Sequence, residues 1–134
     1  MFSPHKTFAS TYHRVHVETG IETADPHRLV GMLFDGALGA ISAARGALAR
    51  GDVAAKCQQV GKAVRIVEEG LRGGLDKTAG GELARNLDQL YAYVVQRLTQ
   101  ANLHNDDAVL RECAELLAPL QDAWRTMNVP AARA

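Results

Sequence analysis

The sequence is poor in the features that many protein classes need. It has two cysteines, 5% aromatic residues and no excess of charge of either sign. Its 15 basic residues balance its 15 acidic ones, and Lys and Arg form no local run. Proteins that bind nucleic acid gain much of their affinity by neutralising phosphates, so this balance argues against a nucleic-acid partner.

The chain also lacks long apolar runs. No stretch approaches the ~20 apolar residues that cross a bilayer, and the first residues, MFSPHKTFASTYHR, contain no continuous apolar region of a signal peptide. We therefore expect a cytoplasmic (cytosolic) protein without membrane insertion. Cys57 and Cys113 lie far apart, form no CxxC motif and fall at apolar helix positions, so we expect two reduced thiols in the core.

Motifs of common active sites are missing too. No Glu is followed three residues later by His, the pairing of di-iron sites in four-helix bundles. The pairs Gly73-Gly74 and Gly80-Gly81 lack the Gly-Lys-Ser/Thr ending of a phosphate-binding loop and indicate helix ends instead. We expect a protein that is not an enzyme and that holds no metal and no cofactor.

Four stretches of helical periodicity are present. Asp25-Pro26 joins a good N-cap residue to a proline suited to the first helical position, so a helix begins there and ends near Gly51-Asp52. A third helix is expected from about Gly81 to Leu103, and a fourth ends near Met127. The second helix has the most regular apolar spacing, 4-3-4-3-4, at Val53, Cys57, Val60, Val64, Val67 and Leu71.

The loops between these helices are very short, which makes consecutive helices antiparallel neighbours. The predicted fold is all-α: an antiparallel up-down-up-down four-helix bundle over residues 25–127. An N-terminal arm, residues 1–24, precedes the bundle, and a flexible tail, residues 128–134, follows it.

Three features exceed what a plain bundle needs. The arm lies outside the helical pattern, yet it carries Phe8 and Tyr12, which need an apolar surface to rest on. It is either a lid packed permanently on one end of the bundle or a detachable plug over a binding groove. The first helix is rich in Gly and Ala, which suits either close packing against a neighbouring helix or a surface that receives a partner helix.

The third feature is an apolar face on the third helix that is wider than one seam, with Ile66 widening the second helix. A surplus of apolar surface often marks a protein-binding site, although helices of globular proteins commonly have faces this wide. The residues expected in a binding groove or in the arm plug are Phe8, Tyr12, Ile66, Leu87, Tyr91, Val94, Val95 and Leu98.

Several segments, in order along the chain, resemble the FliS family of flagellar export chaperones. They are TADP at 23–26, MLFDGA at 32–37, GLD at 74–76, GGELARNL at 80–87, LYAY at 90–93, RLTQAN at 97–102 and AW at 123–124. The resemblance covers residues 12–127 and implies a helical bundle in the bacterial cytosol. The implied partner is flagellin, whose disordered C-terminal segment becomes helical on the chaperone, does not polymerise early and stays competent for flagellar type III export.

The resemblance also implies that the arm, through Tyr12, occupies part of the flagellin groove in the unbound state. The flagellar export gate and an anti-sigma factor are further implied partners. The family's usual Tyr-Asp-Tyr is Tyr91-Ala92-Tyr93 in this chain, which leaves the binding role of position 92 open. The alternative from another class is a bundle that forms a weak homodimer through its spare apolar face and has no disordered client.

Overall fold

The computed structural model describes residues 8–12 and 25–133 of the chain. Within these ranges the chain forms helices and no strand, which confirms the all-α class. The long helices are α3 (Pro26–Ala49), α4 (Val53–Arg65), α5 (Lys77–His104) and α6 (Asp107–Arg133), and α4 continues directly as a π-helix, η1 (Ile66–Arg72). Of the expected arm, residues 1–7 and 13–24 lie outside the described ranges.

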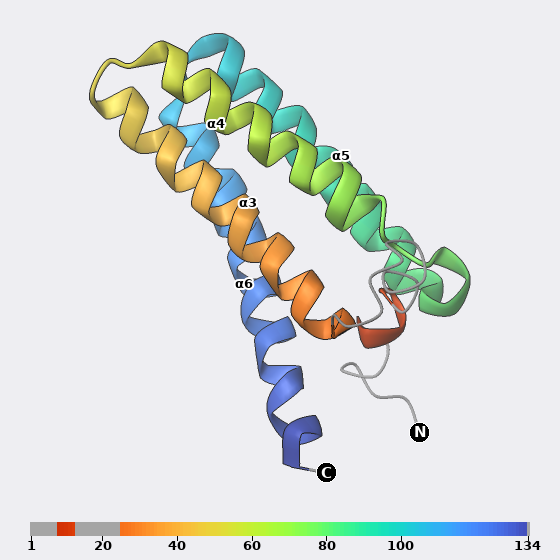
Figure 1. Ribbon diagram of the computed structural model, residues 1–134. Coiled ribbons are helices and arrows are strands. Elements are labelled where there is room, and N and C mark those ends of the chain that lie inside the picture. The colour runs from red at the N-terminus through yellow and green to blue at the C-terminus, as the bar shows by residue number, and fades with distance from the viewer. Residues whose placement is uncertain (1–7, 13–24, 134) are drawn as a thin grey trace.

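The helices form an antiparallel bundle (Figure 1). Helix α3 packs against α4 and α6, and α5 packs against α6 and against the continuous α4–η1 helix. The α3–α4 and α5–α6 turns lie at one end of the bundle, whereas the η1–α5 turn lies at the other end, close to residues 8–12 (Figure 1). The second end is therefore where residues 8–12 meet the bundle (Figure 1).

Aspartate side chains cap the starts of all four long helices, with Asp106 at the start of α6. Asp25 accepts a hydrogen bond from the His27 amide at 3.0 Å, and Asp52 accepts one from the Ala55 amide at 3.0 Å. These contacts confirm the predicted starts of α3 and α4, because an N-cap side chain satisfies an amide that the helix leaves unpaired. Asp76 caps α5 in the same way.

Two predicted helix boundaries differ from the structure. Residues 77–80, which precede the predicted helix start at about Gly81, form a helical turn. The chain changes direction at Gly81, whose φ of 57° is in the region that glycine adopts most readily. At the other end of the chain, α6 runs on to Arg133, through most of the residues expected to form a tail.

The predicted seam of the second helix is wrong in its first half. Cys57 is exposed and Val53 is 48% exposed, whereas Lys56 is buried. The buried positions, Lys56, Val60, Ala63, Val67 and Leu71, are spaced 4-3-4-4, whereas the predicted positions from Cys57 to Leu71 are spaced 3-4-3-4. The two consecutive steps of four around Val67 fit the π-helical turn, which holds more residues than an α-helical turn and so rotates the apolar face.

The burial of Lys56 has a local explanation. Its ammonium group donates to the carbonyl oxygen and to the side-chain oxygen of Asn102, both at 2.7 Å. A long apolar stem can pack in the core while its charged end reaches polar atoms, here near the C-terminus of α5, where cations are favoured. Sequence periodicity assigned this position to Cys57 because it counts a lysine as exposed.

Helix α3 supplies much of the core. Among the described residues, it is the one helix that is long and apolar enough to cross a membrane, by length and composition alone. Its face in the bundle core holds Val30, Phe34, Ala37, Ala40, Ile41, Ala44 and Ala47, so core packing accounts for this apolar character.

The glycines of α3 differ in their surroundings. A β-carbon on Gly36 would lie 3.2 Å from Cδ1 of Ile66, whereas one on Gly39 would meet nothing within 4 Å. Close packing against η1 therefore explains Gly36, and it shows that the Ile66 side chain packs against α3.

Candidate functional site

The described part of the arm is inserted into the bundle. Residues 8–10 form one helical turn, and Phe8 and Tyr12 are only 8% and 1% exposed. This turn lies beside the start of α3 and the η1–α5 turn (Figure 1). We call the place that it occupies the arm slot, and define it by Leu71, Asp76, Gly80, Tyr91 and Trp124.

Trp124 provides the aromatic wall of the arm slot. Its ring centroid lies 4.9 Å from that of Phe8 and 5.5 Å from that of Tyr12, in edge-to-face geometry. Such aromatic pairs contribute about 0.5–1.5 kcal/mol each beyond the area that they bury. The aromatic residues of the arm thus rest on an apolar surface provided by the C-terminal half of α6, as their predicted need for such a surface requires.

His27 holds Trp124 in position. The indole N–H of Trp124 donates to the carbonyl oxygen of His27 at 2.8 Å, and the two rings stack with centroids 4.9 Å apart. Nε2 of His27 lies 2.7 Å from the carbonyl oxygen of Trp124, which completes a reciprocal pair. Sequence analysis missed this pair, because the two residues are 97 positions apart and neither belongs to a motif that names the other.

The hydroxyl group of Tyr12 makes two contacts at the bottom of the arm slot. It lies 2.8 Å from the carbonyl oxygen of Leu71 and 2.7 Å from the hydroxyl oxygen of Tyr91. A hydroxyl carries one proton, so both contacts are hydrogen bonds at once when Tyr12 donates to Leu71 and Tyr91 donates to Tyr12. The arm is therefore tied by side-chain hydrogen bonds to both η1 and α5.

The backbone of the arm adds a third hydrogen bond. The amide of Asp76 donates to the carbonyl oxygen of Thr11 at 2.6 Å. The Thr11 backbone also passes close to Gly80, where a β-carbon would lie 2.9 Å from Cα of Thr11. Glycine at position 80 therefore makes room for the arm backbone.

Burial favours the neutral form of both tyrosines of the arm slot. Loss of solvent raises the pKa of Tyr91 and raises the pKa of Tyr12 well above the ordinary value of a phenol. The two groups therefore stay hydroxyl donors and acceptors even in alkaline solution that would ionise an exposed phenol.

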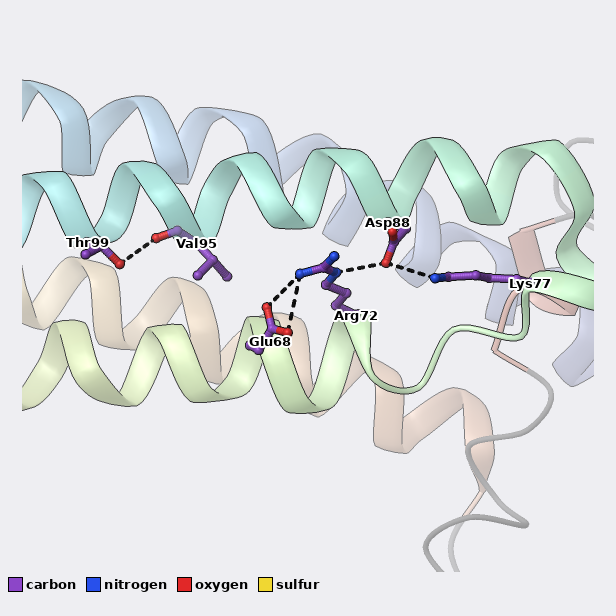
Figure 2. A network of polar contacts seen from close by, with 6 residues as sticks. All are labelled: Glu68, Arg72, Lys77, Asp88, Val95 and Thr99. Atoms are coloured by element: carbon purple, nitrogen blue, oxygen red, sulfur yellow. Dashed lines mark hydrogen bonds and ion pairs between the residues drawn. The ribbon is translucent and has the colours of Figure 1, made fainter.

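Charged side chains join η1 to α5 beside the arm slot. Nε of Arg72 donates to Asp88 at 2.8 Å, its Nη1 reaches Glu68 at 3.1 Å, and Lys77 approaches Asp88 at 3.5 Å (Figure 2). Hydrogen bonding from the Arg72 guanidinium lowers the pKa of the Asp88 carboxyl group. These groups are partly exposed, so they orient the η1–α5 turn more than they stabilise it.

The residues predicted for the groove or plug fall into two sets. Phe8, Tyr12 and Tyr91 meet in the arm slot or at its edge. The other set lies along the bundle: Leu87, Val94 and Leu98 are buried in the core, and Ile66 and Val95 are partly buried against it. The described residues thus do not arrange all eight around one open groove.

Next to Tyr12 lies a surface cavity of about 330 Å³, lined by Ala9, Tyr12, Asp25, Pro26, His27 and Trp124. It lies against the arm and the His27–Trp124 pair, and it leaves space around the inserted segment. Across the described ranges, no three His, Cys, Asp or Glu side chains are grouped as a metal site requires.

Comparison with known proteins identifies the relatives of this chain. Residues 8–131 match the family described as "Flagellar protein FliS". The flagellar secretion chaperone FliS of Salmonella typhimurium is 45% identical over 117 residues, which cover 87% of each chain. The flagellar secretion chaperone FliSB of Pseudomonas aeruginosa is 42% identical over 84% of this chain and 89% of its own. FliS of Bacillus subtilis is 32% identical over 81% and 79% of the two chains.

Proposed function

This chain belongs to the FliS family of flagellar proteins, and we propose that it is a cytoplasmic export chaperone that binds the disordered C-terminal segment of flagellin. In this role it prevents premature polymerisation and keeps flagellin competent for flagellar type III export. Relatives from several bacteria are named flagellar secretion chaperones, and the family is one of non-enzymatic chaperones.

The observation that best supports this proposal is the arm slot. A short segment inserts aromatic side chains between the ends of the bundle helices and makes both apolar and polar contacts there. A client segment that is disordered when free can bind in the same manner, by forming a helix and placing its own anchors in the slot. Ordering the client costs free energy, so the complex stays reversible despite a large contact surface.

In this proposal the arm and the client compete for one slot. Withdrawal of Phe8 and Tyr12 would uncover Trp124 and Tyr91, and Ile66 and Val95 extend the surface along the bundle. Leu87, Val94 and Leu98 are buried in the bundle core while the arm is in place. In this proposal they therefore pack beneath the surface that the client contacts. The arm's binding free energy is then subtracted from the client's apparent affinity.

The other implied partners have less support. The flagellar export gate and an anti-sigma factor come from the family resemblance alone, and we propose no contact residues for them. Weak homodimerisation is the competing hypothesis. Among the described residues, the exposed large apolar ones are Met32 on α3, Val53 on α4, and Tyr93 and Leu103 on α5. Their spread over three helices does not favour one dimer face.

The test is a titration of the full chain with a tryptophan-free peptide from the C-terminal segment of a flagellin. The sole tryptophan of the chain, Trp124, contacts the arm, so its fluorescence reports on arm displacement. We expect helical signal at 222 nm to grow and Trp124 emission to change together, with no response to a scrambled peptide. Self-association with no response to the flagellin peptide would support the homodimer instead.

A further inference from the structure

We propose that the bottom of the arm slot is a polar recognition point, formed by the Leu71 carbonyl group and the Tyr91 hydroxyl group. A segment that replaces the arm has to present a long side chain ending in a hydroxyl or amide group, as Tyr and Gln do. The extension from the arm to a client rests on the proposed function, whereas the recognition point itself does not.

While the slot is occupied, the Leu71 carbonyl group is without its usual backbone partners. In a continuing helix it would accept from the amide of residue 75, or of residue 76 in a π-helix. Here the Leu75 amide donates to Arg72 at 3.2 Å and the Asp76 amide donates to Thr11 at 2.6 Å. The hydroxyl group of Tyr12, at 2.8 Å, takes the place that these amides leave.

Tyr91 creates the second polar requirement. Its side chain is fully buried, and its hydroxyl group meets that of Tyr12 at 2.7 Å. A buried polar group without a partner costs substantially more free energy than one hydrogen bond normally contributes. An occupant with a purely apolar anchor would leave Tyr91 and Leu71 without the hydroxyl that now joins them.

The geometry also limits which side chains fit. The polar atom has to lie at the end of an apolar body, because the Tyr12 ring packs against Trp124 while its hydroxyl group reaches η1 and α5. One residue earlier, the occupant has to offer a backbone carbonyl group to the Asp76 amide, as Thr11 does. A hydroxyl or a primary amide both donates and accepts, as the Leu71–Tyr91 pair requires.

The recognition point can be tested without any client. In the full-length Tyr12→Ala variant, the missing side chain leaves a space that p-cresol fills with both the ring and the hydroxyl group, whereas toluene supplies the ring alone. We expect p-cresol to bind about tenfold more tightly than toluene, as one buried hydrogen bond implies. Adding Tyr91→Phe should reduce that preference. Equal binding of p-cresol and toluene to Tyr12→Ala would overturn the proposal.

A milder set of variants covers the case in which Tyr12→Ala does not fold. Tyr12→Phe, Tyr91→Phe and the double variant form a mutant cycle, measured by urea unfolding followed through Trp124 fluorescence. We expect clear non-additivity, with the double variant losing less stability than the sum of the single variants, because each single change leaves a buried partner unpaired. Additive losses would show that the two hydroxyl groups are not coupled.

The side chain that the proposal requires of a flagellin client is tested separately. In a flagellin C-terminal peptide, each Tyr is changed to Phe and each Gln to Met, one at a time. We expect one change to weaken binding about tenfold to the natural chain and far less to Tyr91→Phe. If no change does so while the peptide still binds, the chaperone function stands and the client requirement is wrong. A p-cresol preference without peptide binding would leave the recognition point standing and contradict the flagellin proposal.

Discussion

His27 and Trp124 hold each other in both directions. The indole N–H donates to the His27 carbonyl oxygen at 2.8 Å, Nε2 of His27 lies 2.7 Å from the Trp124 carbonyl oxygen, and the rings are nearly parallel at 9°. The first turn of α3 is thereby joined to the C-terminal half of α6. The same indole ring contacts Phe8 and Tyr12, so the helix–helix contact also forms the wall on which the arm rests.

The first prediction concerns this pair. Trp124→Phe removes the indole N–H, so the His27 carbonyl group loses that donor. It also replaces the indole ring that contacts the arm with a smaller ring. We expect a loss of about 1–3 kcal/mol in the free energy of unfolding, measured by urea denaturation with circular dichroism. His27→Phe is the complementary variant, because it keeps a stacked ring and the backbone acceptor and removes only the Nε2 contact, so its loss should be smaller than that of Trp124→Phe. If Trp124→Phe is as stable as the natural chain, the pair does not hold α3 to α6.

The hydroxyl group of Tyr12 should matter more than that of an exposed tyrosine. Tyr12→Phe leaves Leu71 and Tyr91 without their shared partner, and we expect a loss of about 1–3 kcal/mol. Tyr93→Phe is the control on α5, where the side chain is 42% exposed and donates to Glu112 at the surface. Its effect should stay within about 0.5 kcal/mol. Equal losses in the two variants would contradict a special role for the arm slot.

Gly80→Ala should push the arm out of its slot. The new β-carbon would lie 2.7 Å from Cγ2 of Thr11 and equally close to Cβ of Ala84, closer than such atoms pack. We expect red-shifted and more easily quenched Trp124 fluorescence, with a loss of about 1–3 kcal/mol.

Gly61→Ala is the control for this change, since a β-carbon on Gly61 of α4 would meet nothing within 4 Å. It should raise stability by about 0.5–1 kcal/mol and leave Trp124 fluorescence unchanged. Unchanged fluorescence in Gly80→Ala as well would show that the arm backbone does not need the space at position 80.

The two thiols should differ in reactivity. Cys57 is exposed on α4, whereas Cys113 is buried and desolvation raises its pKa to about 12. At pH 8 we expect a thiol reagent to modify one thiol of the native protein quickly and the second only after unfolding. Peptide mapping identifies the first as Cys57, and a Cys57→Ser variant should show no fast phase. Rapid native labelling of Cys113 would contradict its place in the core.

The bundle should lose stability in alkaline solution. Burial raises the pKa of Tyr12 and of Tyr91 above about 10, the ordinary value that they regain on unfolding. Above pH 10 the unfolded chain therefore releases protons that the folded chain retains, and the free energy of unfolding falls as pH rises. The slope is up to about 1.4 kcal/mol per pH unit for each tyrosine. In the Tyr12→Phe/Tyr91→Phe variant, urea denaturation between pH 9 and 11 should show a shallower fall.

Local chemistry by itself determined much of the architecture. Asp25-Pro26 and Asp52 begin helices because their side chains cap amides a few residues away, and short loops make consecutive helices antiparallel. The family resemblance also follows from ordered motifs in the sequence. Phe8 and Tyr12 could be singled out because large apolar residues lay outside any helical pattern.

Only the tertiary structure decided what these residues contact. Tyr12 meets Leu71 and Tyr91 at separations of 59 and 79 positions, and no local pattern states which distant carbonyl group a hydroxyl group will reach. The exchange of Cys57 for Lys56 in the core has the same origin, since it depends on a π-helical turn and on the oxygens of Asn102. Periodicity records which face of a helix is apolar, but long-range packing decides which atoms share that face and which polar groups are buried with them.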